Sequence, residues 1–142
     1  MLRYEIEKQL FNGDLEVDDL PSTWNSMFKS WFDVEVPEDR LGCLQDIHWS
    51  MGAFGYFPTY TLGNLYAAQL LEAMAADLGN IDDMVASGDW EPMLEWLRPR
   101  IHQRGSQVSP AQLIEDATGA PPSPEPFLRY VERKYGALYQ LG

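Results

Sequence analysis

The residues best able to do chemistry lie in one stretch in the middle of the chain, Gly42 to Asn64. It holds His48, one of only two histidines, with a carboxylate two positions earlier at Asp46, and it also carries five aromatic residues and four glycines. If the segment from Gln45 to Trp49 is extended, alternation places Asp46 and His48 on one face. An imidazole beside a carboxylate can hold or move a proton near neutral pH, so this stretch has the composition of an active site.

A structural interpretation of the same residues is equally simple. Asp46 and His48 would then form a buried hydrogen-bonded pair that anchors the loop to a helix starting near Thr61, without touching any ligand. The glycines and Pro58 indicate a loop whose backbone approaches other groups closely. The residues by themselves leave both interpretations open.

Several catalytic and metal-binding patterns are absent from the sequence. A common type of zinc hydrolase carries His-Glu-x-x-His on one helix face, and His48 and His102 are too far apart to form it. His102 is instead predicted to be a capping cation near a helix end. Cys43, the single cysteine, excludes an internal disulfide and is predicted to be a small buried hydrophobe. P-loops and Gly-x-Ser-x-Gly are also missing. Because the sequence has neither His-Glu-x-x-His nor an EF-hand loop, we predict no metal ligand in this chain.

The charge balance argues against two classes of partner. The net charge is −12, from 22 acidic residues against 10 lysines and arginines. Phosphates and anionic lipid headgroups are bound through lysine and arginine, so we expect neither nucleic-acid nor membrane binding. No apolar run reaches the roughly 20 residues of a transmembrane helix, and the charged first residues do not resemble a signal peptide. With a single cysteine, these features favour a cytoplasmic protein.

Hydrophobic periodicity predicts an all-α fold of about six or seven helices. The short extended segment near Gln45–Trp49 is the one exception, and the length favours a single helical domain over residues 1–142. The aromatic stripe from Trp24 to Phe32 is predicted to lie in a core or an interface. Pro99 lies inside a predicted helix, where we expect a kink. The helical patterns cover residues 2–12, 22–32, 62–78, 90–101, 110–118 and 124–138.

The central stretch reads Gly42-x-x-Gln45-Asp46-x-His48-Trp49, followed by Gly55-Tyr56-Phe57-Pro58-Thr59-Tyr60. This pattern resembles a signature of the carboxypeptidase Taq family, zinc metallocarboxypeptidases that remove single residues from peptide C-termini. The resemblance implies a mostly helical fold with a deep groove, in a metal-dependent and dimeric enzyme. It extends to flanking segments, namely Arg3 to Glu7, Trp96-Leu97, Ile101-His102, Ala117 to Gly119, Pro126 to Tyr130 and Lys134 to Gly136.

The resemblance also implies roles for residues of the central stretch. His48, oriented by Asp46, would donate a hydrogen bond to the substrate or to the oxyanion of a tetrahedral intermediate. Tyr56 or Tyr60 would act as a second, phenolic donor, so these three are supporting catalytic candidates. The groove wall that binds the substrate would carry Gln45, Asp46 and Trp49.

In full-length members of that family, the zinc-binding residues and the arginines for the substrate carboxylate lie upstream of the segment that matches Arg3. We therefore expect a C-terminal fragment or truncated relative of the enzyme, inactive alone and without a metal of its own. One alternative is half of a split metallocarboxypeptidase, which binds a peptide substrate only after an upstream fragment completes it. Another is a non-enzymatic module that self-associates, for example as a homodimer. The first helix begins at Met1 without a capping residue, which suggests that more chain once preceded it.

Overall fold

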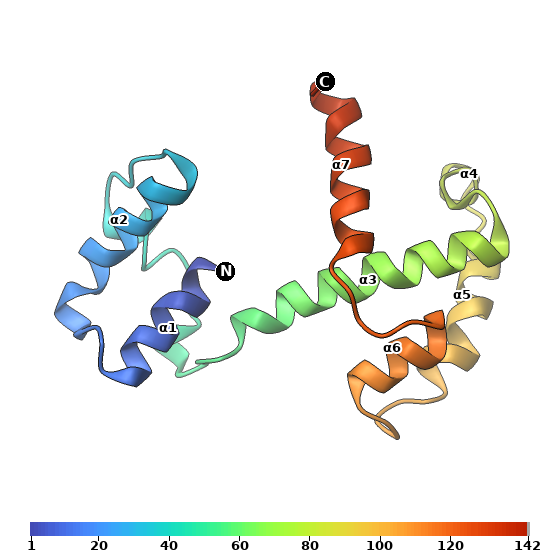
Figure 1. Ribbon diagram of the computed structural model, residues 1–142, viewed down its shortest axis with the longest axis horizontal. Helices are drawn as coiled ribbons and strands as arrows, with labels where there is room; N and C mark the ends of the chain where they lie inside the picture. The colour runs from blue at the N-terminus through green and yellow to red at the C-terminus, as the bar shows by residue number, and fades with distance from the viewer. Residues whose placement is uncertain (142) are drawn as a thin grey trace. The chain divides into compact units, whose positions relative to one another are not determined.

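The computed structural model describes residues 1–141, and within them the chain is helical, with no strand (Figure 1). The predicted all-α class and the number of helices are therefore confirmed. None of the helices in this part of the chain combines the length and the apolarity needed to cross a bilayer. The α-helices are α1 (Leu2–Asn12), α2 (Leu20–Phe32), α3 (Phe57–Leu78), α4 (Ile81–Ser87), α5 (Glu91–Leu97), α6 (Pro110–Thr118) and α7 (Glu125–Tyr139).

The chain forms two compact units, called here unit 1 (Met1–Thr61) and unit 2 (Leu62–Gly142). Unit 1 contains α1, α2, the long loop after them and the first residues of α3. Unit 2 contains the rest of α3 and the helices α4 to α7. That the two units together form a single domain over residues 1–142 stays a prediction.

The core of unit 1 is built around Trp24 on α2 and Ile6 on α1, which are 1% and 0% exposed. Burying an apolar side chain of this size stabilises the fold by roughly 1.5–3 kcal/mol. Cys43 is buried beside them, as predicted, and burial raises the pKa of its thiol. The aromatic stripe of α2 is divided, because Trp31 and Phe32 at its C-terminal end are about half exposed.

Gly42 has no side chain because the core leaves no room for one. A Cβ atom at this position would lie 2.7 Å from Cγ1 of Val36 and 3.2 Å from Cδ1 of Trp24. Contacts under 3.0 Å between such atoms are essentially never observed, so a methyl group here would force the core apart. The loop therefore leaves the core at a glycine.

The core of unit 2 consists of Met74 on α3, Ile81 on α4 and Trp96 on α5. The helix that contains α5 does not continue regularly, because it becomes a π-helical turn, η4 (Arg98–His102), at Pro99. Proline has no N–H for the α-helical bond, and the amide of Gln103 instead reaches back five residues to the carbonyl of Arg98 at 2.9 Å. The helix is therefore irregular at Pro99, where the sequence predicted a kink, and the irregularity takes the form of a π-helical turn.

Three local details differ from the predictions. One helix, α4, was not predicted; it begins after Asn80, whose side chain accepts from the backbone amides of Asp82 and Asp83. Residues Gln45–Trp49 do not form an extended segment: they bend, and the backbone of His48 is helical, with φ −60° and ψ −49°. The reason is a local hydrogen bond at 3.2 Å, in which the carboxylate of Asp46 accepts from the backbone N–H of His48 and competes with an extended chain. In addition, α3 begins at Phe57, five residues before the predicted beginning, because Pro58 is tolerated in a first helical turn.

Candidate functional site

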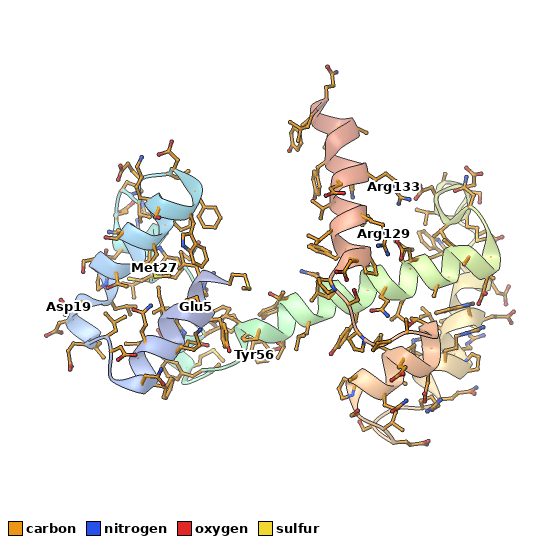
Figure 2. All side chains as sticks on the ribbon, in the orientation of Figure 1. Glu5, Asp19, Met27, Tyr56, Arg129 and Arg133 are labelled. Atoms are coloured by element: carbon orange, nitrogen blue, oxygen red, sulfur yellow. The ribbon has the colours of Figure 1, made fainter. Side chains whose placement is uncertain are left out.

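The candidate site lies in unit 1 and consists of six side chains, called here the His48 cluster. The loop after Gly42 supplies Asp46 and His48, and α1 supplies Arg3. The early beginning of α3 places Phe57 and Tyr60 one turn apart on a helix, and Figure 2 shows Tyr56 at the beginning of the same helix. The cluster is therefore Arg3, Asp46, His48, Tyr56, Phe57 and Tyr60.

A chain of hydrogen bonds runs through the cluster. Nδ1 of His48 lies 3.1 Å from Oδ1 of Asp46, and Nε2 lies 3.2 Å from the hydroxyl of Tyr60. The ionised carboxylate of Asp46 can only accept hydrogen bonds. Nδ1 of His48 therefore carries a proton, and this N–H donates a hydrogen bond to Asp46. In the neutral imidazole Nε2 is then an acceptor, and the Tyr60 hydroxyl donates to it. The structure thus brings Asp46, His48 and Tyr60 together and selects one tautomer of His48.

Aromatic rings hold the imidazole of His48 in place. Its centroid lies 4.7 Å from that of Phe57 and 5.5 Å from that of Tyr56, which is stacked at an interplanar angle of 28°. Tyr56 and Tyr60 also pack edge to face, with their centroids 5.3 Å apart. Tyr56 contacts the imidazole through its ring face, and among the hydrogen bonds of residues 1–141 its hydroxyl has no bond to His48.

The electrostatics of the cluster keep Asp46 charged and Tyr60 neutral. Partial burial would raise the pKa of Asp46, but the backbone N–H of His48, the Arg3 guanidinium and the His48 ring together hold that pKa below its usual range. For Tyr60, partial burial, the neighbouring Tyr56 and the Asp46 carboxylate raise the pKa of the hydroxyl. At neutral pH the cluster therefore contains a carboxylate acceptor and an intact phenol.

Arg3 was not among the predicted site residues, and the structure places it at the base of the cluster. Its Nη2 lies 2.6 Å from Oδ2 of Asp46, so Asp46 is held between Arg3 on one oxygen and His48 on the other. The guanidinium also lies over the rings of Trp24 and Phe57, at 5.0 Å and 4.7 Å from their centroids. These contacts fix the carboxylate that in turn orients the imidazole.

Glu7 is a second residue that the sequence prediction missed. It lies one turn after Arg3 on α1 and is only 4% exposed. Its carboxylate accepts from the indole Nε1–H of Trp49 at 2.8 Å and from the backbone N–H of Gly55 at 3.2 Å. The sequence carried no usable local signal for this role, because the four-residue spacing of Arg3 and Glu7 would indicate a pair between them, whereas Arg3 pairs with Asp46.

The three predicted substrate-binding residues have different surroundings. Gln45 lines an open hollow of about 320 Å³ in unit 1, together with Arg3 and Tyr60. Asp46 is held inside the His48 cluster, while Trp49 packs edge to face against Trp24 with the centroids 6.1 Å apart. Only Gln45 of the three is therefore presented to a free space. Besides Tyr60, the aromatic residues that line the hollow are Trp24, Phe28, Phe32 and Phe57.

The described residues do not form a metal centre. In residues 1–141 no three histidine, cysteine, aspartate or glutamate side chains come together in a way that could hold an ion. The second histidine, His102, lies in the π-helical turn of unit 2. A metal ion would need ligands other than those this part of the chain supplies.

Comparisons with known proteins agree with one another. The family model described as "Carboxypeptidase Taq (M32) metallopeptidase" matches residues 1–135. Thermostable carboxypeptidase 1 of Thermus thermophilus is 47% identical over 139 residues, which are 98% of this chain and 27% of that protein. Carboxypeptidase 1 of Bacillus subtilis is 40% identical over 141 residues, covering 99% of this chain and 28% of that protein.

Solved structures give the same result. Metallocarboxypeptidase 1 of Trypanosoma cruzi matches with a TM-score of 0.89 and 43% identity, over 94% of this chain and 28% of that one. The M32 carboxypeptidase of Deinococcus radiodurans R1 matches with a TM-score of 0.91 and 35% identity, over 98% and 28%. The chain thus spans about a quarter of the length of these relatives, and it matches their C-terminal part.

Proposed function

Because this chain belongs to the carboxypeptidase Taq (M32) family of metallopeptidases, we propose that its His48 cluster contacts the peptide substrate of a metal-dependent carboxypeptidase. The family and the C-terminal position are those that the central signature predicted. The activity itself is a proposal, since the chain covers 27% to 28% of the length of its relatives. The observation that supports the proposed activity is the chain of hydrogen bonds from Asp46 through His48 to Tyr60, which lies beside an open hollow.

The atom that this cluster offers to a substrate is the hydroxyl of Tyr60. While His48 is neutral, the Tyr60 proton points to Nε2, and the phenol oxygen can accept an N–H from a peptide. When His48 is protonated, Nε2–H donates to the phenol oxygen of Tyr60. The Tyr60 O–H stays protonated and is then free to point to a carbonyl oxygen or an oxyanion of the substrate and donate a hydrogen bond to it. His48 therefore acts through Tyr60, and Asp46 keeps its Nδ1 protonated in both states.

The metal of such an enzyme does not fit the residues described here. Residues 1–141 gather no set of three ligands, so the zinc that the family implies would be bound by residues outside this chain. We accordingly propose that the chain alone is inactive, and that it works as the substrate-side wall of a complete or split enzyme. Its single free cysteine, Cys43, supports a reducing and hence cytoplasmic location.

Reconstitution tests this function. The chain would be mixed with the Thermus thermophilus relative lacking its last quarter, with zinc or cobalt, and assayed for release of C-terminal residues from blocked dipeptides. We expect no turnover by the chain alone and metal-dependent turnover by the mixture. The chain offers matched controls, since His48→Ala and Tyr60→Phe should remove activity whereas His102→Ala and Tyr139→Phe should not.

Two results would overturn the proposal. Turnover by the repurified chain without an added partner, lost in His48→Ala, would contradict inactivity alone. A stable mixed complex whose activity is unchanged by both His48→Ala and Tyr60→Phe would remove the cluster from the reaction.

Self-association is a second candidate, favoured by the C-terminal end of unit 2. Leu138, Tyr139 and Leu141 in and after α7 are 64% to 70% exposed, which is unusual for large apolar side chains so close together. Burial of these residues against a second copy would give a homodimer. Sedimentation velocity at increasing concentration would show a dimer, weakened by Leu138→Glu, and a strict monomer would contradict it.

A further inference from the structure

We propose that Glu7 is a positioning residue, which joins the two ends of the loop from Trp49 to Gly55 and thereby holds His48 against Tyr60. The catalytic meaning of this role rests on the function proposed above. The structural part of the inference stands on contacts within unit 1 alone.

The chemistry of Glu7 suits a clip made of two acceptors. It is one of the two buried polar residues of the described chain, and both of its oxygens are used, Oε1 by Trp49 and Oε2 by Gly55. No lysine or arginine of residues 1–141 forms an ion pair with it. A carboxylate removed from water without a cation is tolerated only when its hydrogen bonds are well made. Two neutral N–H donors from one loop meet that requirement.

Along the chain the two anchor points lie between the two parts of the His48 cluster, because Asp46 and His48 come before Trp49, and Tyr56, Phe57 and Tyr60 come after Gly55. Trp49 directly follows His48, whose carbonyl accepts from the amides of Met51 and Ala53 at 3.2 Å and 2.9 Å and so begins a tight turn. At the other end, Gly55 has φ +72°, a left-handed conformation that only glycine adopts easily, and its N–H points to Glu7. The next residues of the chain carry the rings that pack on the imidazole.

Glu7 therefore fixes both sides of the imidazole with respect to α1. If the Trp49 end moves, Nε2 of His48 moves with it, and if the Gly55 end moves, the beginning of α3 and Tyr60 move. The bond from Nε2 to Tyr60 is 3.2 Å long, near the upper end of the usual range, so a small displacement breaks it.

The nature of the clip predicts which substitution is damaging. In Glu7→Gln the side chain keeps its size, but its single oxygen can accept from only one end of the loop, and its NH2 group then faces the other N–H donor. In Glu7→Asp both oxygens are kept on a side chain one methylene shorter. We expect Glu7→Gln to lose the hydrogen bond to one end of the loop, and Glu7→Asp to keep weaker hydrogen bonds to both Trp49 and Gly55.

The test measures the histidine itself in the 142-residue chain labelled with 15N. The tautomer of His48 is given by its Nδ1 and Nε2 chemical shifts, and the indole resonance of Trp49 is assigned by its loss in Trp49→Phe. We expect Glu7→Gln to shift the Trp49 indole or the Gly55 amide, and to lower the fraction of the Nδ1–H tautomer of His48. Tyr60→Phe should perturb His48 in the native chain and add little in the Glu7→Gln background.

A matched control separates positioning from stability. Gln69→Ala removes the other buried polar residue, which lies in unit 2, and should lower the stability without changing the His48 resonances. An unchanged His48 tautomer in folded Glu7→Gln would overturn the inference. If Glu7→Gln does not fold, Glu7→Asp serves instead, and it must shift the same resonances relative to the native chain, since unchanged resonances would again overturn the inference. None of these measurements needs activity, so they fail or succeed independently of the proposed function.

Discussion

Within residues 1–141 each unit buries one polar side chain, and each of these two side chains holds a loop in place, one as an acceptor of hydrogen bonds and the other mainly as a donor. Glu7 in unit 1 is 4% exposed and accepts two N–H groups from one loop. Gln69 in unit 2 is 5% exposed, and its Nε2 donates to the hydroxyl of Thr118 and to the carbonyls of Ala120 and Pro121 at 3.0–3.1 Å. Its Oε1 also accepts from the amide of Ser123 at 3.1 Å.

The difference follows from the backbone groups that each loop leaves free. The connector held by Gln69 contains Pro121 and Pro122, which have no N–H, so it presents mainly carbonyls and needs a donor. The loop held by Glu7 presents an indole N–H and the N–H of Gly55, so it needs an acceptor. The neutral amide of Gln69 suffices to fix the connector between α6 and α7, whereas the charged carboxylate of Glu7 fixes the loop that carries the His48 cluster.

The largest effect on stability is expected when the buried amide of unit 2 is replaced by a carboxylate like that of unit 1. Gln69→Glu would place a carboxylate oxygen opposite the carbonyls of Ala120 and Pro121, which can only accept, and this should lower the free energy of unfolding by about 3–5 kcal/mol at pH 7. Burial among acceptors favours the protonated acid, so its pKa in the folded state should rise, and the lost stability should return as the pH falls. Urea denaturation from pH 4 to pH 8 measures this. A pH-independent loss would contradict the comparison.

Activity should depend on unit 1 side chains and not on their counterparts in unit 2. In the reconstituted enzyme, removal of the Tyr60 hydroxyl by Tyr60→Phe should lower kcat by about 100- to 1,000-fold, the usual effect of losing a donor to an oxyanion. Tyr139→Phe in α7 is the matched control and should leave kcat unchanged. Equal losses in both variants would show that the assay measures assembly and not the cluster.

The opposite exchange, Glu7→Gln, should cost less. It leaves one buried N–H of unit 1 without an acceptor, which should lower the free energy of unfolding by about 1–3 kcal/mol. Because Glu7→Gln introduces no new titratable group, the stability that it loses should vary less with pH than the stability lost in Gln69→Glu. The same urea series measures both variants, and a larger effect for Glu7→Gln would reverse the proposed order.

The smallest effects are expected at the ion pairs, where the units again differ. The side chains of Arg3 and Asp46 are 27% and 28% exposed, whereas those of Arg129 on α7 and Glu72 on α3 are 57% and 49% exposed. We expect Arg3→Met to lower the unfolding free energy by about 1 kcal/mol and Arg129→Met by less. The pKa of Asp46 is lowered in the fold, so the contribution of this pair is present above about pH 4 and is lost as the pH falls further. Salt should reduce only the Arg129 contribution appreciably.

The sequence predicted the helices well because their signals are local. Gly13 and Gly119 end α1 and α6 with φ of +79°, and Ser109 caps α6 by accepting from the amide of Gln112. The pairing of Asp46 with His48 was also predictable, since the two residues are two positions apart. Its cause was wrong in the prediction, because a side chain to backbone bond and not strand alternation brings them together.

The rest of the site depends on contacts that spacing does not reveal. Glu7 meets Trp49 and Gly55 across 42 and 48 positions, and Arg3 meets Asp46 across 43 positions. An acidic residue in an amphipathic helix is usually solvated, so nothing local distinguished Glu7 from Glu5. The beginning of α3 was missed for a related reason, because Gly55 and Pro58 are typical of loops as well as of helix starts.

Gly42, the first residue of the central signature, has a consequence for how related sequences should vary. Its missing side chain makes room first for Cγ1 of Val36, which a Cβ atom at position 42 would approach to 2.7 Å, and then for the ring of Trp24 at 3.2 Å. We therefore expect position 42 to covary with position 36 and, less strongly, with position 24: valine at 36 should accompany glycine at 42, and alanine at 42 should need a smaller residue at 36. The glycine that opens the signature would then be a record of core packing, and its presence alone would say nothing about catalysis.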